Sequence, residues 1–204
     1  MSATRMRSAR CAVVGAMCAI ASVAAADEPI IEAVWKPQHV AFLYTSSTTR
    51  YNCRELASKL KRVLQTLGAH EDIHVDHSAC SEVSARLRVR FKSPVPATAA
   101  NVVSITTYDA TEQLAARLNK QTLPTSEALP RFAATWHEVS FARHPSLRLD
   151  SSDCQFVEDV RRQMLPRLAA TTTSNRLFCT PGFPGISRPK LKVKVLLAAA
   201  ALDR

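Results

Sequence analysis

The feature that most constrains the fold is a cysteine at the first turn of an amphipathic helix pattern, which occurs twice in the chain. In the first copy Asn52 and Glu55 flank Cys53 in a capping-box-like start, and Gly68 is a natural stop. Its apolar positions form one helical stripe: Leu56, Leu60, Val63, Leu64 and Leu67. A weaker copy begins at Cys154. The chain is therefore expected to hold two amphipathic helices, each tied down near its start.

Residues 1–26 have the pattern of a secretory signal peptide. Arg5, Arg7 and Arg10 form a basic segment, an apolar run follows, and Ala24–Ala26 provides a small-residue cleavage site. The apolar run, residues 11–25, is short for a membrane span, which needs roughly 20 residues. We therefore expect a periplasmic or secreted protein with no transmembrane segment after removal of the signal; an uncleaved anchor is the alternative.

Four cysteines remain once the signal segment is set aside. In an exported chain they predict two disulfides, and three pairings are open. The repeated helix pattern favours Cys53 with Cys80 and Cys154 with Cys179, because the two spacings, 27 and 25 residues, nearly match. The spacings contain no C-x-x-C pair, so a zinc site is disfavoured and no metal is predicted.

Strand patterns surround each helix and give the order strand, helix, strand, strand twice. We expect strands at residues 38–46, 73–80 and 86–92, and again at 135–143, 175–179 and 190–195. The predicted fold is α+β, an internal duplication in which each unit is a helix on an antiparallel sheet, closed by one disulfide. The predicted organisation is a signal peptide at 1–26, a first unit at 27–97, a connecting segment with a short helix at 98–130, and a second unit at 131–204.

Three local expectations can be checked directly. Strict alternation along residues 72–80 places Cys80 on the polar face, so pairing with a core-facing helix requires a β-bulge or an early strand end. Val102, Val103 and Ile105 favour a strand, whereas Leu114 to Leu118 favours a helix capped by Asp109 or Thr111. Pro166 must kink or end the second amphipathic helix.

Residues 42–91 carry a further pattern: the run Thr49–Cys53, the helix end Leu67–Ala69, and Cys80. In these features the chain resembles a group of exported proteobacterial proteins of unknown function. The resemblance implies export across a bacterial inner membrane. It implies no activity, cofactor or catalytic residue.

Basic residues alternate with apolar ones on one strand of each unit. The seven cations are Arg86, Arg88, Arg90, Lys92, Lys190, Lys192 and Lys194. Such faces would hold an anionic partner by charge, although outward cations also guard strand edges, and Asp72 and Asp76 would neutralise Lys92 and Arg88 if a hairpin placed them opposite. The basic faces carry no aromatic side chains for base stacking, which disfavours nucleic acid.

Signals for catalysis are weak. Asp72, His74 and Asp76 share a strand face that a divalent metal could use, but a solvated face is the commoner role. There is no G-x-S-x-G elbow, and no thiol remains free if both cysteine pairs are oxidised. We therefore predict a non-enzymatic, exported binding or envelope-associated module without a cofactor. The alternatives are an enzyme, hydrolase-like, with a site in the Thr180–Pro189 loop or the 98–130 segment, and a subunit that pairs through a β edge.

Overall fold

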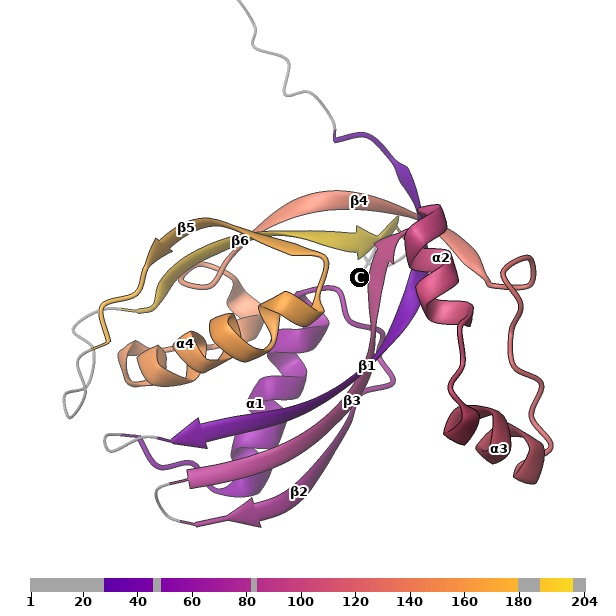
Figure 1. Cartoon of the computed structure of the whole chain (residues 1–204). Helices are drawn as coiled ribbons and strands as arrows, with labels where there is room; N and C mark the ends of the chain where they lie inside the picture. Colours follow the sequence, from indigo (N-terminus) through magenta and orange to yellow (C-terminus); the bar gives the residue numbers. More distant parts are fainter. Residues whose placement is uncertain (1–27, 46–48, 82–83, 180–187, 200–204) are drawn as a thin grey trace, which may run out of the picture.

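The computed structural model describes residues 28–45, 49–81, 84–179 and 188–199, and it is an α+β fold (Figure 1). Six antiparallel strands of the described chain form one sheet in the order β2-β3-β1-β4-β6-β5. The strands are β1 (Ile31–Thr45), β2 (His74–Cys80), β3 (Ser84–Pro96), β4 (Arg131–Ser140), β5 (Ala170–Arg176) and β6 (Lys190–Ala198). The α-helices are α1 (Cys53–Thr66), α2 (Ala99–Thr106), α3 (Ala110–Leu118) and α4 (Cys154–Gln163).

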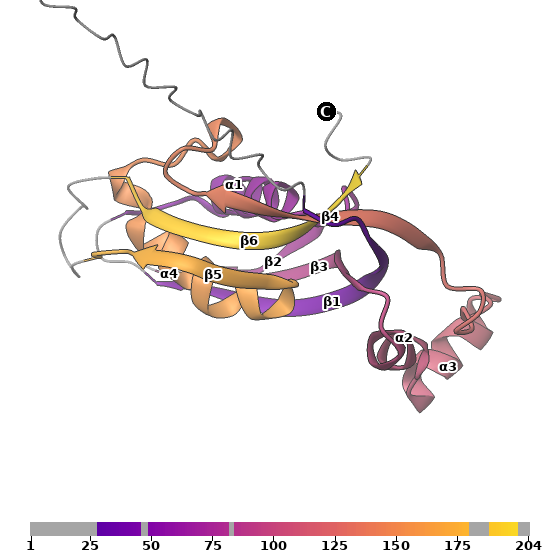
Figure 2. The same cartoon turned by 90° about the horizontal axis from the view of Figure 1, so that it is seen from above.

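The sheet has two parts of three strands each, which meet only over a short stretch. We call β1, α1, β2 and β3 the first half and β4, α4, β5 and β6 the second half. In each half the first strand pairs with the third and the third with the second. The halves join where Ile31–Val34 of β1 pairs with residues 131–134 of β4. Beyond this point the strands diverge, and α1 and α4 lie between the two parts of the sheet (Figures 1 and 2).

One hydrophobic core spans both halves. It contains Phe42 and Leu87 of the first part of the sheet, Leu191 and Val193 of the second, and the apolar faces of both helices. The helix α1 buries Leu56, Ala57, Leu60, Val63 and Leu64. The stripe predicted from the sequence therefore faces the core, which is how an amphipathic helix gains most of its stability.

The ends of the two helices differ. At the end of α1, Ala69 N donates to Leu64 O at 2.9 Å and Gly68 N to Gln65 O at 3.0 Å, with Gly68 at φ +87°. This is a Schellman ending, which glycine adopts without a Cβ penalty. A Cβ on Gly68 would lie 2.5 Å from the carbonyl oxygen of Leu196, so the missing side chain also lets α1 approach β6.

The helix α4 ends as its proline predicts. It stops at Gln163, and a 3₁₀ turn, Leu165–Arg167, begins around Pro166. The side-chain amide of Gln163 accepts from Leu43 N at 2.8 Å and donates to Leu43 O at 2.7 Å. A side chain thus takes the place of a strand partner on β1, in the region where β4 has diverged from it.

Disulfides join Cys53 to Cys80 and Cys154 to Cys179, as the repeated pattern predicts, with Cα–Cα distances of 6.2 and 5.5 Å. Each ties the first residue of a helix to the end of the next strand or just beyond it. The register of β2 against β3 shifts between His77 and Ala79, so Cys80 lies opposite Ala85, a core-facing residue. This bulge reverses the face of the strand and resolves the conflict found in the sequence.

Several predicted strand boundaries are wrong, and β4 covers Arg131–Ser140 where residues 135–143 were expected. The strand β1 starts at Ile31 and not at residue 38, and it includes Pro37, which lies past the residues that pair with β4. The strand β3 continues through Pro94 to Pro96, where β2 no longer pairs and an edge position tolerates proline. The strand β5 covers Ala170–Arg176 and not residues 175–179, because pairing with β6 overrides its polar, threonine-rich composition.

The structure of the connecting segment also differs from the prediction. Residues 99–106 form α2, whereas a strand was expected around Val102, because Thr98 caps the helix and Val102 packs with Val34 and Val95. The helix α3 begins with a capping box at Asp109, as predicted. Figure 1 shows α3 extending away from the sheet.

In the part of the chain that the structure describes, no helix is long and apolar enough to cross a membrane. The predicted signal peptide, residues 1–26, lies outside the described residues.

Candidate anion-binding pocket

The seven predicted cations lie on the sheet surface, in one sheet but on two separated strands. Those of β3 and Lys190 are exposed, whereas Lys192 and Lys194 are half-buried. Arg90 pairs with Asp76 at 3.2 Å, Lys192 with Glu138 at 2.7 Å, and Lys194 with Glu28 at 2.6 Å. The hydrogen bond from Lys192, followed by that from Thr173, lowers the pKa of Glu138. Acids of the chain itself therefore neutralise part of both basic faces.

The acidic residues of the first half only partly follow the prediction. Asp76 lies opposite Arg88 in the register, but its ion pair is formed with Arg90. Asp72 lies before β2, and its partner is His74, at 3.3 Å. The Asp72, His74 and Asp76 face thus has local polar partners, and no cluster of three metal-ligating side chains occurs among the described residues.

A cavity of about 340 Å³ lies where β4 ends, in the connection between β4 and α4. Its polar lining consists of Arg143, His144, Arg148, Asp150 and Arg188. Its apolar lining consists of Phe141, Ala142, Pro145 and Leu149. Three arginines against one carboxylate make it a cationic pocket, and we refer to it below as the arginine pocket.

The backbone of this connection is fixed by the core beneath it. Phe141 N donates to Leu191 O at 2.9 Å, so the start of the connection is held beside β6. Leu147 and Leu149 are buried with the core cluster. Between them Arg148 adopts φ +47°, in the left-handed region. A non-glycine residue rarely does so, and such positions gather at functional sites.

The charges of the arginine pocket are not balanced within it. Arg143, Arg148 and Arg188 form no ion pair with any described residue. Asp150 already accepts from Ser152 N at 2.7 Å and from the Ser152 hydroxyl at 2.5 Å. The side-chain bond from Ser152 is the main reason that the pKa of Asp150 is lowered. The acid in the pocket is thus engaged by its own turn, and the arginines are left for another partner.

The imidazole of His144 adds a second signal. Its Nδ1 atom is buried and has no hydrogen-bond partner in the described part of the chain. A buried polar atom without a partner is costly, and it usually marks a place that water or a ligand satisfies.

The first half anchors the wall of the pocket through a buried polar cluster. Asp153 is fully buried and is ion-paired with Lys59 of α1, and it also accepts a hydrogen bond from the hydroxyl of Tyr51. Its other oxygen accepts from Asp150 N at 2.9 Å. Burial, together with the hydrogen bond to Asp153, raises the pKa of Tyr51. The loop that lines the pocket is therefore tied to α1.

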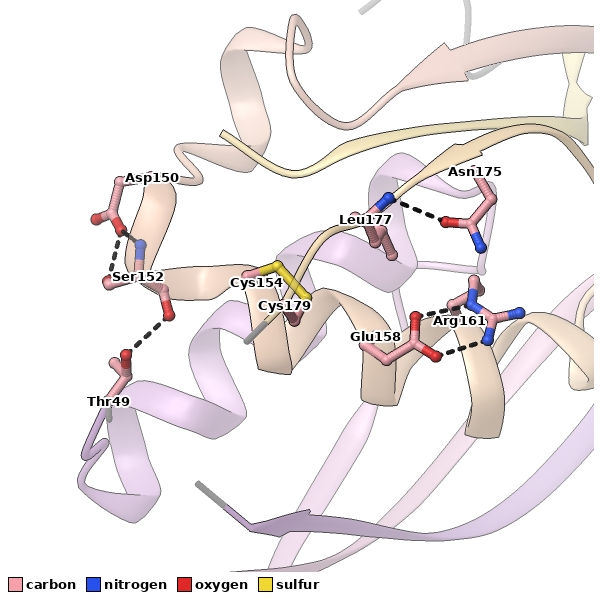
Figure 3. Close-up of a disulfide and its surroundings, with 9 residues drawn as sticks. All are labelled: Thr49, Asp150, Ser152, Cys154, Glu158, Arg161, Asn175, Leu177 and Cys179. Atoms are coloured by element: carbon pink, nitrogen blue, oxygen red, sulfur yellow. Dashed lines mark hydrogen bonds and ion pairs between the residues drawn. A yellow bond between two sulfur atoms is a disulfide. The ribbon is translucent and has the colours of Figure 1, made fainter. Parts of the chain in front are cut away.

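Figure 3 shows a second tie next to the Cys154–Cys179 disulfide. The hydroxyl of Thr49, just before α1, donates to Ser152 O at 2.8 Å. The same view shows Asp150 turned toward Ser152, and Glu158 bonded to Arg161 on α4. The hydrogen bonds from Arg161 lower the pKa of Glu158.

The positive charge continues from the pocket along the sheet. Lys190 lies two residues after Arg188 and is opposite Arg176 in the register of β5 and β6. Both side chains are exposed, and neither forms an ion pair with a described residue. Like charges directly opposite each other destabilise a strand pair, so this end of the sheet gains from an anion.

The sequence did not predict the arginine pocket. Residues 144–152 carry no helix or strand pattern, and no motif in the sequence pairs His144 with another residue. A usable signal was present: the connection is long and carries Arg143 and Arg148. The loop Thr180–Pro189, proposed for an enzyme site, lies outside the described residues except for Arg188 and Pro189.

Comparison of the chain with models of known protein families, with curated proteins and with solved structures finds no match.

Proposed function

We propose that this protein is an exported, non-enzymatic binding module whose arginine pocket holds an anionic group. One observation carries the proposal: Arg143, Arg148 and Arg188 surround a single cavity without forming an ion pair with any described residue. Unpaired arginines around a cavity are suited to a phosphate or carboxylate group, because the guanidinium fork binds either one through two parallel hydrogen bonds. The imidazole of His144 lies in the same lining and adds a polar group beside the arginines.

The lining of the pocket supports binding over catalysis. Its described lining contains no serine, threonine or cysteine to serve as a nucleophile. Its carboxylate, Asp150, is engaged by Ser152 and is held in its charged form. Positioning of an anion by arginines is therefore the chemistry that the site favours.

We also propose that the chain is exported and arose by duplication. Two disulfides are typical of proteins that fold in an oxidising compartment, such as the periplasm or the extracellular space. Duplication is supported by three repeated properties: the element order, the strand-pairing pattern, and the disulfide from the helix start. The resemblance to exported proteobacterial proteins, stated above from the sequence, supports the same compartment.

A second candidate is a subunit that pairs through the β5 edge. This strand ends the sheet, and its residues Thr171–Asn175 are uncharged and largely exposed. Uncharged, exposed edges are templates for a partner strand. The register shift between Thr172 and Ser174 weighs against this candidate, because a bulge interrupts regular pairing.

The proposal is tested by titrating the mature protein with inorganic phosphate in a calorimeter at fixed ionic strength. We expect Arg148→Gln to weaken binding about tenfold, because one charge-assisted bidentate contact is lost. The matched control is Arg88→Gln, another exposed arginine, on β3, which should leave the affinity unchanged. Equal losses in the two variants, or no binding by the wild type, would contradict the pocket as the anion site.

A further inference from the structure

We infer that the ligand of the arginine pocket is an organic anion with a compact apolar body, of the class of short alkyl or aryl phosphates and carboxylates. The inference rests on the proposed function and adds the chemical class of the ligand. The size of the cavity, the side chains of its lining and the distribution of charge around it favour this class of ligand.

The cavity is too large for an inorganic ion alone. It measures about 340 Å³. A water molecule occupies about 30 Å³ of liquid, and a phosphate group, with five heavy atoms, fills the space of about two or three waters. Cavities of roughly 300–1,000 Å³ are typical of sites for organic molecules. Most of the space therefore remains for the part of the ligand that carries no charge.

The apolar side chains of the lining that remain accessible are those of Ala142, which is half-buried, and Pro145, which is exposed. Phe141 and Leu149 also line the cavity, but they are 1% and 5% exposed and belong to the core cluster, so they hold the backbone of the lining in place and offer little surface themselves. Because the core already holds this backbone, the lining does not need to be ordered by the ligand, which keeps the entropic cost of binding small.

The charges of the lining place one anionic group in the pocket. The three arginines attract it, and the imidazole of His144 belongs to the same lining. The carboxylate of Asp150 lies in the same lining and repels a second anionic group. A single charged head with a neutral body satisfies both the polar and the apolar sides.

A matched ligand series tests the inference by calorimetry. The series is inorganic phosphate, methyl phosphate and butyl phosphate, with pentanoate as the carboxylate arm and butanol as the uncharged control. We expect affinity to rise about fourfold for each added CH₂ that enters the cavity, and butyl phosphate to bind at least tenfold more tightly than inorganic phosphate. Butanol should not bind measurably, because the arginines gain nothing from it.

Variants separate the apolar wall from the charged head. Pro145→Ser, at an exposed position of the lining, should reduce the advantage of butyl phosphate over inorganic phosphate. Ala142→Ser, at the other accessible apolar position, is the second variant and should act in the same direction. Arg148→Gln should weaken both phosphates equally.

The ligand series gives different results if this inference is wrong and if the proposed function is wrong. If butyl phosphate and pentanoate bind no more tightly than inorganic phosphate, the pocket holds only a small ion and the inference is overturned. If no anion in the series binds, the proposed function itself is wrong. A gain with either organic head supports the inference, and the better head identifies the acid group.

Discussion

The two halves of the molecule share an architecture but differ in how the first strand leads to the helix. In the first half, residues 46–52 connect β1 to α1. In the second half, residues 141–153 connect β4 to α4, a connection nearly twice as long. The extra residues carry Arg143, His144 and Arg148, which together with Arg188 line the cavity. The common parts build the core, and the part that differs builds the candidate site.

Unlike two independent domains, the halves share buried contacts. Tyr51 and Lys59 of the first half meet Asp153 of the second in a buried cluster. Gly68 lets α1 approach β6, and Gln163 of α4 binds the edge of β1. Each helix therefore contacts the opposite half. We predict that substitutions at contacts between the halves lower the free energy of unfolding more than substitutions within one half.

The largest loss of stability is expected from a substitution in the buried cluster of Tyr51, Lys59 and Asp153. Lys59→Met leaves the buried Asp153 without its cation, and removing one partner of a buried pair costs about 3–5 kcal/mol. Urea unfolding measures the loss. Lys61→Met is the matched control on the same helix, since no ion pair of Lys61 with a described residue is found. Equal costs for the two substitutions would show that the cluster does not join the halves.

The next effect compares the two disulfides. Replacing Cys53 and Cys80 by alanine, or Cys154 and Cys179, should cost about 3.5 kcal/mol in each case, because the closed loops are nearly equal, with separations of 27 and 25 residues. Only the second replacement should also weaken phosphate binding, since Cys154 directly follows the loop that lines the pocket. Loss of phosphate binding in the first pair as well would remove this distinction between the halves.

A smaller effect is expected at the end of α1. Gly68→Ala forces alanine into a left-handed conformation and places a Cβ 2.5 Å from Leu196 O, at a cost of about 1–3 kcal/mol. Gln65→Ala, on the exposed side of the same helix, should change the free energy of unfolding little. Thermal unfolding of the two variants distinguishes a tight contact with β6 from a general sensitivity of α1.

The smallest change in stability is expected at Asp159 of α4, and it depends on pH. Asp159 is 2% exposed, and burial raises its pKa despite the ion pair with Arg162. The charged form is thus disfavoured by folding, and this cost is relieved as pH falls through the folded-state pKa. Asp159→Asn should therefore raise the urea midpoint at pH 7, and the gain should shrink on acidification.

Glu158→Gln is the control for that experiment, because it has the opposite sign. Arg161 lowers the pKa of Glu158, so its contribution is present above the unfolded pKa and is lost as pH falls through the folded one. The substitution should lower the urea midpoint at pH 7, with a difference that disappears in acid. The same direction for both variants would contradict the assigned pKa shifts. No comparable acid lies on α1, whose buried residues are all apolar.

The sequence predicted what depends on local patterns. The α1 stripe, the Gly68 ending, the Pro166 stop and the two cysteine pairings follow from spacing and propensity. Even the bulge before Cys80 was one of two solutions demanded by the alternation of the strand. The strand expected near Val102 was wrong, because the Thr98 cap and packing against β1 and β3 outweigh the preference of β-branched residues for strands.

The pocket escaped prediction because Arg188 joins the lining residues between 141 and 150 only through the pairing of β4 with β6. Phe141 is held beside Leu191, and this pairing brings Arg188 to Arg143 and Arg148 across some forty positions of sequence. By contrast, the basic strand pattern is conspicuous in the sequence, but Asp76, Glu138 and Glu28 neutralise part of it. Ion pairing of this kind is decided by neighbours distant in the chain.

The most direct test follows the arginine side chains themselves during a phosphate titration. In a nuclear magnetic resonance spectrum of the protein, each arginine Nε–H signal reports its own surroundings. We predict that the signals of Arg143, Arg148 and Arg188 shift and saturate together, while that of Arg88 on β3 stays in place. Saturating shifts at Arg88 with none at Arg148 would contradict the central claim that the connection between β4 and α4 carries the binding site.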